Sequence, residues 1–415
     1  MAPTSHRLPV DGPVLPPEPP AWSRDLQTVG VTGTNGKTTT TALTASALGL
    51  HHGPVARVTT VGAFLDEHRL DLPESFDGFL AALQSGLDGG GRYAAIELTS
   101  EALALGFAKA WPCSVGVFTN LTRDHLDAHG SAEHYLASKA QLFVHLPADG
   151  AAVLNGCDPA SELLAEVTPP GVRVIRYGVP SRGPATGALD LRGVAVHYDW
   201  TGTQVSVKIE GDLAAELGVD QIELRVRAIG AVQAENALAA FGAAAALGVP
   251  PEVACRGLLQ APRPPGRFEP IAEQPRVVVD YAHTPDALRR TLGAARDLCS
   301  GRLWVVFGAG GERDQAKRAP MGQAASVADR VVITSDNPRG EDPAEIAAAV
   351  RRGVEPPARV ELELDRRTAI RGALASAGPE DLVVIAGKGH ETTQRIGGEV
   401  RALDDREIVR QALRT

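Results

Sequence analysis

A glycine-rich segment near the start of the chain combines residue types that bind phosphate groups. Thr28–Thr38 is typical of a strand, a turn containing Gly33 and Gly36, and the first turn of a helix. Turn amides can face phosphate oxygens, the Lys37 ammonium can balance the β- and γ-phosphates, and the Thr38 hydroxyl can bind Mg²⁺. The usual phosphate-loop spacing has one more glycine where this chain has valine, so a plain glycine turn before a helix is the alternative.

Polar side chains follow two further predicted strands. Glu97 lies near the end of Tyr93–Leu98, and Asn120 and His125 follow the strand that begins at Val115. Because ligands gather at the carboxyl ends of strands in doubly wound sheets, we expect these three side chains to converge on the glycine-rich turn. Taken singly, the glutamate can face water and the histidine can cap a helix.

A lysine at position 139 lies in a segment, residues 131–145, with the length and pattern of an amphipathic helix. Spacing alone predicts that such a lysine lies on a solvated helix face. The residues themselves assign it no chemistry.

Strand-like runs alternate with helix-length segments along the chain, which predicts an α/β fold with mostly parallel sheets and helices on both faces. Residues 179–227 differ, because Gly-rich turns separate alternating segments, and they predict a small antiparallel insertion. The expected helices include Thr38–Leu50 and a buried one at Ala237–Val249. The expected strands are Thr28–Thr32, Tyr93–Leu98, Val115–Asn120, Ala151–Asn155, Val277–Asp280, Leu303–Phe307, Arg330–Thr334 and Leu382–Ala386.

The length of 415 residues allows two or three domains. A Pro-Arg-Pro-Pro-Gly run at 262–266 predicts an inter-domain connection, since proline fixes φ and cannot donate a ladder hydrogen bond. We therefore expect a proline-rich leader over 1–26, a central domain over 27–262 and a C-terminal domain over 263–415. Seven prolines among residues 1–20 favour an extended leader.

Composition narrows the class of partner. The formal net charge is −9, which argues against sequence-blind binding of nucleic acid or an anionic membrane. No apolar run reaches the roughly 18 residues of a membrane span. Four widely spaced cysteines form no CxxC pair, which fits a reducing cytoplasm better than a disulfide framework or a zinc site. We expect a cytoplasmic protein with small-molecule substrates.

Seven motifs in order resemble the ATP-dependent Mur ligases, and most of all their MurE type. The resemblance runs from about residue 28 to the end of the chain. The motifs begin at Gly33 (Gly-Thr-Asn-Gly-Lys-Thr-Thr), Asn120 (Asn-Leu-Thr-Arg-Asp-His), Gly266 (Gly-Arg-Phe-Glu), Asp280 (Asp-Tyr-Ala-His-Thr-Pro-Asp), Phe307 (Phe-Gly-Ala-Gly-Gly-Glu-Arg-Asp), Asp336 (Asp-Asn-Pro-Arg) and Gly387 (Gly-Lys-Gly-His-Glu).

The resemblance implies a central ATP-binding domain and a C-terminal Rossmann-like domain. It also implies a reaction in which a carboxylate attacks the γ-phosphate of ATP, giving an acyl phosphate and ADP. An amine then attacks the acyl carbon, and phosphate leaves. Two anions must meet in this chemistry, so cations and Mg²⁺ are needed beside them.

Roles for individual residues follow from the resemblance alone. It implies catalytic roles for Lys37, His125, Lys139 and Arg267. It implies Mg²⁺ binding by Thr38, Glu97, His125 and Lys139, the last as a carbamoylated lysine. It implies ATP binding by Gly33, Thr34, Asn35, Gly36, Lys37, Thr38, Thr39, Asn236, Arg267 and Asp280, with Asn236 near adenine and Asp280 at the ribose. Without the resemblance, Arg267 is a plain surface charge.

On the amine side, the Asp-Asn-Pro-Arg motif at 336–339 resembles the form found in enzymes that add meso-diaminopimelate. A planar guanidinium at Arg339 suits bidentate binding of that amino acid's distal carboxylate. The alternative for the motif is a turn that stops a helix. The implied amino-acid-binding residues are Arg313, Asp336, Asn337, Arg339, Gly387 and Glu391.

The side that would bind the carboxylate substrate departs from the family pattern. Asp71-Leu72-Pro73 stands where the family has Thr-Thr-Pro, Thr99-Ser100-Glu101 where it has Ser-Ser-His, and Phe107 where it has arginine. The family also carries an N-terminal UDP-binding domain of roughly a hundred residues, for which the expected leader leaves no room. A separate partner chain supplying that domain is one explanation.

Three hypotheses follow. The departures favour an amide ligase that couples a non-standard carboxylate to a diaminopimelate-like amino acid. The first alternative is UDP-N-acetylmuramoyl-L-alanyl-D-glutamate–2,6-diaminopimelate ligase of peptidoglycan synthesis. The second is a non-catalytic nucleotide-binding protein, against which the set Lys37, Glu97, His125 and Lys139 argues.

Overall fold

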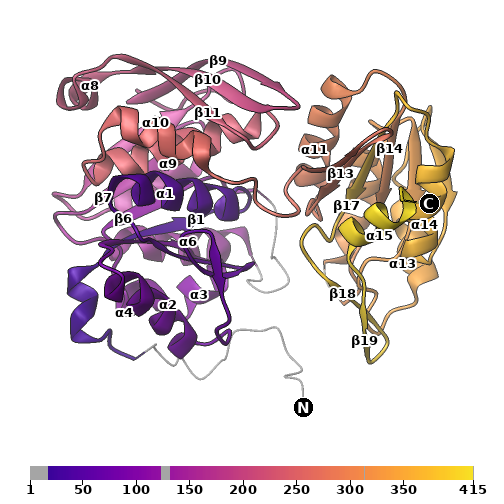
Figure 1. Cartoon of the computed structure of the whole chain (residues 1–415), viewed down its shortest axis with the longest axis horizontal. Helices are drawn as coiled ribbons and strands as arrows, with labels where there is room; N and C mark the ends of the chain where they lie inside the picture. Colours follow the sequence, from indigo (N-terminus) through magenta and orange to yellow (C-terminus); the bar gives the residue numbers. More distant parts are fainter. Residues whose placement is uncertain (1–16, 123–130, 313, 415) are drawn as a thin grey trace. The chain divides into compact units, whose positions relative to one another are not determined.

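The computed structural model describes residues 17–122, 131–312 and 314–414. The chain divides into two compact units, Met1–Pro262 and Arg263–Thr415, here called the N-terminal and C-terminal units (Figure 1). Each unit is built on its own sheet, and the predicted α/β class is confirmed in both.

In the described part of the N-terminal unit, eleven strands form one sheet in the order β11-β10-β9-β8-β7-β6-β1-β5-β2-β3-β4. Every pair from β2 through β5, β1, β6, β7 and β8 to β9 is parallel. The strands are β1 Gln27–Thr32, β2 Ala56–Thr59, β3 Gly62–Leu65, β4 His68–Leu70, β5 Tyr93–Glu97, β6 Val115–Phe118, β7 Ala151–Asn155, β8 Arg173–Gly178, β9 Leu191–Asp199, β10 Gly202–Ile209 and β11 Gln221–Val226.

Both edges of this sheet are antiparallel. The predicted insertion is present as β9, β10 and β11, which extend one edge of the large sheet. The hairpins β2–β3 and β3–β4 extend the opposite edge, and the sequence analysis did not predict them. Strands β3 and β4 are short, and none of their residues is buried, so they lack the apolar alternation that signals a strand.

Helices cover both faces of the sheet (Figure 1). On one face α1, α9 and α10 form a core with β1, β6 and β7, and on the other α2, α3, α4, α6 and α7 form a second core. The Ala-rich α9 is almost entirely buried, as predicted, although it begins and ends several residues earlier. The helices are α1 Lys37–His52, α2 Phe76–Asp88, α3 Ser100–Ala104, α4 Phe107–Ala110, α6 Ala132–Val144, α7 Ala160–Val167, α8 Gly211–Leu217, α9 Val232–Ala246 and α10 Pro251–Gln260.

The last residues of the predicted leader fold against the N-terminal unit. Ala21–Asp25 form a short 3-10 helix, η1. Within it, Trp22 lies 6.1 Å from Trp111, measured between ring centroids, and Trp111 contacts Phe79 edge-on at 5.2 Å. The leader is therefore not extended through residue 26.

In the C-terminal unit, a six-stranded sheet has the order β12-β13-β17-β14-β15-β16 among the described residues, and only the β12–β13 pair is antiparallel. Helices α14 and α15 pack on one face. The strands are β12 Glu269–Glu273, β13 Arg276–Asp280, β14 Leu303–Phe307, β15 Arg330–Ile333, β16 Arg359–Leu362 and β17 Leu382–Ala386, with a hairpin of β18 Thr393–Ile396 and β19 Glu399–Ala402. The helices are α11 Pro285–Leu298, η2 Gln315–Lys317, α12 Arg318–Ala325, α13 Pro343–Arg351, α14 Arg366–Ser376 and α15 Asp405–Ala412.

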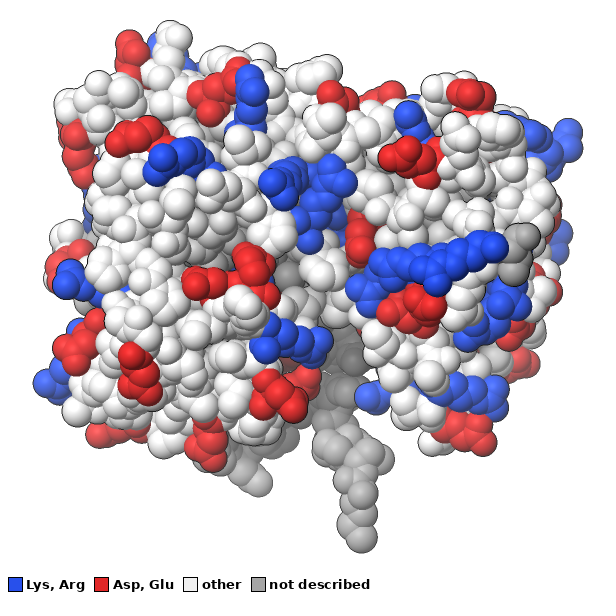
Figure 2. Space-filling model, in the orientation of Figure 1, with Lys and Arg blue, Asp and Glu red and all other residues white. Residues whose placement is uncertain are grey.

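Acidic and basic side chains are interspersed over the faces that Figure 2 draws, without a large region of one sign on either unit. This agrees with the modest excess of acidic residues in the composition. None of the helices in the described part of the chain combines the length and the apolar character needed to cross a membrane.

Candidate active site

The glycine-rich turn lies between the end of β1 and the start of α1, at the centre of the large sheet. Gly33 and Gly36 both have positive φ, 149° and 89°. A Cβ on Gly33 would lie 1.9 Å from Thr119 Oγ1, and one on Gly36 would lie 2.4 Å from Asn236 Oδ1. The turn therefore requires glycine at both positions for its backbone angle and for the space around it.

The end of β6 holds this turn in place. The Asn35 amide donates to Asn120 Oδ1 at 3.0 Å, and Asn120 Nδ2 donates back to the Asn35 carbonyl at 3.0 Å. Thr34 N–H donates to the Asn120 carbonyl at 2.8 Å, and Thr119 Oγ1 donates to the Asn35 carbonyl at 2.7 Å. Asn120 thus lies on the turn, as the strand-end argument predicted, and it fixes the turn's conformation.

Two lysines converge on the Gly33 carbonyl. Lys37 Nζ donates to it at 3.1 Å and to the Thr34 carbonyl at 2.9 Å, and Lys139 Nζ donates to it at 2.9 Å. The Lys139 ammonium also lies 4.2 Å from the centroid of the Tyr135 ring. Two positive charges beside a glycine turn are suited to balancing a polyphosphate.

The prediction that Lys139 lies on a solvated helix face is wrong. Its side chain is on the buried face of α6, with 1% of the residue exposed. Tyr135 precedes it by four residues and Leu142 follows it by three, and both are buried. The i, i+4 and i+7 spacing therefore places the lysine in the buried stripe of the helix.

Thr38 and Glu97 meet where α1 begins and β5 ends. Thr38 Oγ1 donates to Glu97 Oε2 at 2.9 Å. The Thr60 amide donates to the same oxygen at 3.2 Å, and the Thr60 hydroxyl reaches both carboxylate oxygens. A hydroxyl and a carboxylate are the oxygen ligands that Mg²⁺ accepts, so this pair fits the ion.

The described residues contain only part of the predicted set of metal ligands. Among the described residues, no group of three or more His, Cys, Asp or Glu side chains could hold a metal ion. His125 lies outside the described residues. The hydroxyl, one carboxylate and the lysine at 139 are therefore the elements of the predicted set that the structure places around the turn.

Asn236, predicted to lie near adenine, is on α9 and faces the start of α1. Its Oδ1 accepts from Thr40 Oγ1 at 3.3 Å, and its Nδ2 donates to Gln233 Oε1 at 2.8 Å. The residue is 3% exposed. Asn236 therefore packs against the glycine turn. Three other predicted ATP-binding residues, Thr34, Thr38 and Thr39, are buried around the turn.

In the C-terminal unit, the segment of Arg267 contacts the segment of Asp280. The Arg267 guanidinium lies 4.2 Å from the centroid of the Tyr281 ring. Asp280 Oδ2 accepts from the Phe268 amide at 2.6 Å, and its Oδ1 accepts from the Ala282 amide at 2.8 Å. Asp280 therefore orders the segment that carries the arginine.

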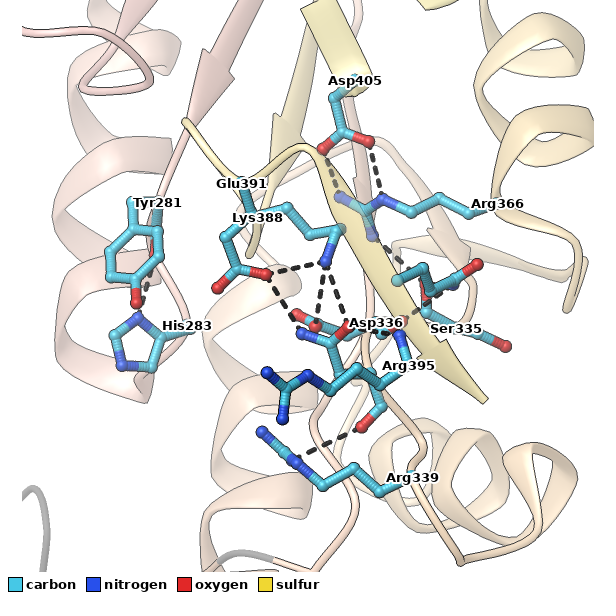
Figure 3. A network of polar contacts seen from close by, with 12 residues as sticks. Tyr281, His283, Ser335, Asp336, Arg339, Arg366, Lys388, Glu391, Arg395 and Asp405 are labelled. Atoms are coloured by element: carbon cyan, nitrogen blue, oxygen red, sulfur yellow. Dashed lines mark hydrogen bonds and ion pairs between the residues drawn. The ribbon is translucent and has the colours of Figure 1, made fainter. Parts of the chain in front are cut away.

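Four of the six predicted amino-acid-binding residues form a cluster that follows β15 and β17 (Figure 3). Asn337 Nδ2 donates to Glu391 Oε2 at 3.1 Å. Gly387 has a φ of 112°, and a Cβ there would lie 2.8 Å from Asp336 Oδ2. The structure thus brings Asp336, Asn337, Gly387 and Glu391 together.

Lys388 is the centre of this cluster, and the sequence analysis gave it no role. Its Nζ donates to Glu391 Oε2 at 2.8 Å and to Asn337 Oδ1 at 3.2 Å, and it lies 4.0 Å from Asp336 Oδ1. Burial alone would raise the pKa of Glu391, but the Lys388 ammonium and the hydrogen bonds from Lys388 and Asn337 outweigh it and lower that pKa. The glutamate is therefore a carboxylate at neutral pH.

Arg339 adopts the left-handed backbone conformation, with a φ of 53°. Its amide donates to the Arg395 carbonyl at 3.1 Å, and its carbonyl accepts from the Gly397 amide at 2.6 Å. One guanidinium nitrogen donates to the Gly311 carbonyl. Hydrogen bonds to β18 and the residue after it therefore hold the strained backbone of Arg339. Arg313, the other predicted arginine, lies outside the described residues.

A fully buried ion pair between Arg366 and Asp405 contacts the strand ends that carry the cluster. Arg366 Nη2 lies 2.7 Å from Asp405 Oδ2, and both side chains are 0% exposed. Arg366 also donates to the carbonyls of Ser335 and Ala386, at the ends of β15 and β17 (Figure 3). The pair joins α14, α15 and both strand ends, and residue types alone gave no sign of this arrangement.

The three positions that depart from the family pattern lie beside α2, α3 and α4. Asp71 and Glu101 are exposed. Phe107 is partly buried and contacts Phe79 edge-on, with 5.3 Å between ring centroids. The surface therefore has acidic groups and an aromatic ring where the family pattern has hydroxyls and a cation.

Comparisons with known proteins agree with the motifs. A model of the Mur ligase middle domain matches residues 31–244, and a model of the Mur ligase glutamate ligase domain matches residues 266–389. The UDP-N-acetylmuramoyl-L-alanyl-D-glutamate–2,6-diaminopimelate ligase of Thermosynechococcus vestitus is 40% identical over 403 residues, covering 94% of this chain and 78% of the relative.

Solved structures of Mur ligases also resemble this chain. A structure of UDP-N-acetylmuramoyl-L-alanyl-D-glutamate–2,6-diaminopimelate ligase superposes with a TM-score of 0.63 at 32% identity, covering 94% of this chain and 78% of that one. The UDP-N-acetylmuramate-alanine ligase MurC of Thermotoga maritima shares the fold, with a TM-score of 0.64 at 19% identity over 95% of this chain and 76% of its own.

Proposed function

The chain belongs to the Mur ligase family of ATP-dependent, amide-bond-forming ligases, and on that premise we propose that it couples UDP-N-acetylmuramoyl-L-alanyl-D-glutamate to 2,6-diaminopimelate. The observation that carries the proposal is 40% identity to a relative of that name over 94% of the chain. The comparisons thereby favour the first alternative of the sequence analysis over its preferred non-standard carboxylate. The non-catalytic hypothesis finds no support among these relatives.

In the N-terminal unit, we propose that the turn at Gly33–Gly36 cradles the phosphates of ATP. Lys37 and Lys139 supply two positive charges beside it, and Thr38 and Glu97 supply oxygen ligands for Mg²⁺. When bound, ATP and Mg²⁺ provide the phosphoryl group and the charge balance that carboxylate activation needs. The part of this chain's residues is to orient the phosphates and reduce the repulsion between two anions.

The role of carbamoylated Lys139 remains part of this proposal. As an ammonium, Lys139 adds a positive charge and donates to the Gly33 carbonyl. As a carbamate it would instead bring a negative charge and an oxygen ligand to the same turn. His125 completes the proposed set of ligands, and Asn236 belongs to the proposed nucleotide site of the N-terminal unit. In the C-terminal unit, Arg267 and Asp280 are the proposed nucleotide-binding residues.

In the C-terminal unit, we propose that the Asp336–Asn337–Glu391 cluster binds the amino acid. Two carboxylates with one ammonium leave one negative charge, which matches an incoming α-ammonium group. The Arg339 guanidinium suits the distal carboxylate of diaminopimelate, because a planar fork binds a carboxylate through two hydrogen bonds. Arg313 belongs to the same proposed site.

A second candidate, a ligase for a different carboxylate, is favoured by one specific observation. Asp71 and Glu101 are exposed acids, and Phe107, in contact with Phe79, stands where the family pattern has the arginine expected beside an anionic muramyl peptide. The two candidates share ATP, Mg²⁺ and the amino acid. They differ only in the acid that is activated.

Product analysis separates the candidates. The full chain is incubated with ATP, Mg²⁺, diaminopimelate and either UDP-N-acetylmuramoyl-L-alanyl-D-glutamate or a panel of other carboxylic acids, and products are identified by mass spectrometry. The proposed function predicts ADP and an amide whose mass is the sum of the two substrates minus one water. Product from another acid alone would establish the second candidate, and no amide with any acid would refute both.

A further inference from the structure

A buried lysine occupies the centre of the proposed amino-acid site. Lys388 follows β17 between two glycines of positive φ, Gly387 at 112° and Gly389 at 51°. Its side chain is 0% exposed, which is rare for lysine unless its charge is paired. Its hydrogen-bond acceptors, on Asn337 and Glu391, and the Asp336 carboxylate 4.0 Å away all belong to residues of the proposed site.

The lysine fixes the orientation of the Asn337 amide. Lys388 Nζ and the Arg395 amide both donate to Asn337 Oδ1, at 3.2 and 2.9 Å. The oxygen of this side chain is thereby directed to the lysine, and Nδ2 is left to donate to Glu391 Oε2 at 3.1 Å. Without the ammonium, one of the two donors that select this orientation is lost.

The lysine also sets the charge of the site. Asp336 and Glu391 contribute two negative charges, and the ammonium leaves one. Other charged groups of the cluster are Arg366, whose charge Asp405 balances, and His390, which lies next to Glu391 in the chain. Arg339 and Arg395 also lie beside it (Figure 3). The Lys388 ammonium, 2.8 Å from Glu391 Oε2 and 4.0 Å from Asp336 Oδ1, reduces the repulsion between these two carboxylates.

We propose that Lys388 is a positioning residue of the amine half of the reaction: it balances part of the negative charge of Asp336 and Glu391 and holds Asn337 in one orientation, so that the site can receive the ammonium group of the amino acid. The inference rests on the proposed amino-acid site. Lys388 itself is fully buried behind these three side chains, so it acts through them and does not transfer protons or touch the reacting atoms.

Steady-state kinetics of Lys388→Met test this inference. With ATP and the acid substrate saturating, we expect the KM for diaminopimelate to rise about tenfold or more, while the KM values for ATP and the acid substrate stay within about twofold. The ratio kcat/KM for diaminopimelate should fall more steeply in the variant than in the wild type as the pH decreases from about 8 to about 6, because protonation of a carboxylate then adds to the protonation of the substrate amine that both enzymes share.

Two further variants make the result specific. Lys208→Met removes a lysine whose side chain is 54% exposed on β10 of the N-terminal unit, and it should leave all KM values unchanged. Lys388→Met/Glu391→Gln again carries a single negative charge at the cluster, so its pH profile should return to that of the wild type even if its KM stays high. A lysine that serves folding alone would give no such return.

The inference is overturned if Lys388→Met raises all three KM values by the same factor, leaves the diaminopimelate KM unchanged, or shows the wild-type pH profile. Calorimetric titration of diaminopimelate into wild-type and variant chains separates this test from the proposed function. If the wild type binds diaminopimelate without ligating it to the muramyl peptide, the proposed function fails, and the loss of binding in Lys388→Met still tests the inference. Absence of binding to the wild type overturns both.

Discussion

Gly36 offers a quantitative test of how the glycine turn is built. Its φ is 89°, and an added Cβ would lie 2.4 Å from Asn236 Oδ1. Gly90 has almost the same φ, 86°, and nothing lies within 4 Å of the added Cβ. Because both glycines belong to the N-terminal unit, substitution by alanine at each separates backbone strain from steric displacement within one unfolding transition.

The expected magnitudes follow from these two environments. A left-handed backbone costs alanine about 1–2 kcal/mol, and the reduced entropy of the unfolded chain offsets about 0.4–1 kcal/mol of this at both positions. Gly36→Ala must also displace the Asn236 amide, which is buried and bonded to Thr40 and Gln233. Two hydrogen bonds at a net value of about 0.5–1.5 kcal/mol each add about 1–3 kcal/mol to the Gly36 variant alone.

Thermal unfolding of the full chain with and without ATP measures both effects. We expect Gly36→Ala to be less stable than Gly90→Ala by about 1–3 kcal/mol and to lose most of its stabilisation by ATP, which Gly90→Ala should retain. In an Asn236→Ala background, the extra cost of Gly36→Ala should disappear, since the displaced amide is gone. Equal destabilisation at the two glycines, or an extra cost that persists without Asn236, would refute the steric argument.

Three further predictions concern single charged groups. Glu97→Gln should weaken the Mg²⁺ dependence of ADP formation by about tenfold or more, because a carboxylate ligand loses its charge, whereas Thr60→Ala, which removes only a hydrogen bond to Glu97, should not. Asp405→Asn should lower the free energy of unfolding by about 3–5 kcal/mol, measured with denaturant, because it leaves the buried Arg366 guanidinium unpaired; a change near zero would contradict the ion-pair argument. The pKa of Asp381 lies below the ordinary 3.8, since hydrogen bonds from two backbone amides and an indole outweigh the opposing effect of burial. The ionised Asp381 therefore stabilises the folded state above its ordinary pKa, and this stabilisation is lost as the pH falls through the lower pKa of the folded state. The free energy of unfolding should fall more steeply with decreasing pH in the wild type than in Asp381→Asn, and equal slopes would contradict this role of Asp381.

The strands were predictable where their residues are apolar and branched. Ala151–Asn155, Leu303–Phe307 and Leu382–Ala386 have the predicted bounds, because each is buried over its whole length in a parallel sheet. The edge strands β3 and β4 were missed for the opposite reason: they are short and contain no buried residue, and they are defined by hydrogen bonds of β3 to β2 and of β4 to β3.

The position of a candidate site residue was predictable where the residue directly follows a strand. It was less predictable where contacts with residues distant in the sequence determine whether the side chain is buried. Asn120 was expected at the glycine turn and lies there. Lys139 could have been found from its spacing, since Tyr135 and Leu142 place it on the apolar face of α6, but the charge of the residue argued for solvent. Lys388 depends on Asn337, 51 residues earlier in the chain, and a contact of that separation leaves no local pattern.

The position of β1 between β5 and β6 determines which parts of the protein are free to change. The three neighbouring strands carry Glu97, Lys37 and Asn120 at their ends, and each is hydrogen-bonded on both sides within the sheet. The antiparallel strands β10 and β11 lie at one margin, several strands away, whereas the turn of the β2–β3 hairpin carries Thr60, which is hydrogen-bonded to Glu97. Insertions or new side chains at the β10–β11 margin can therefore change the surface without moving the glycine turn, whereas changes in the β2–β3 turn act directly on Glu97.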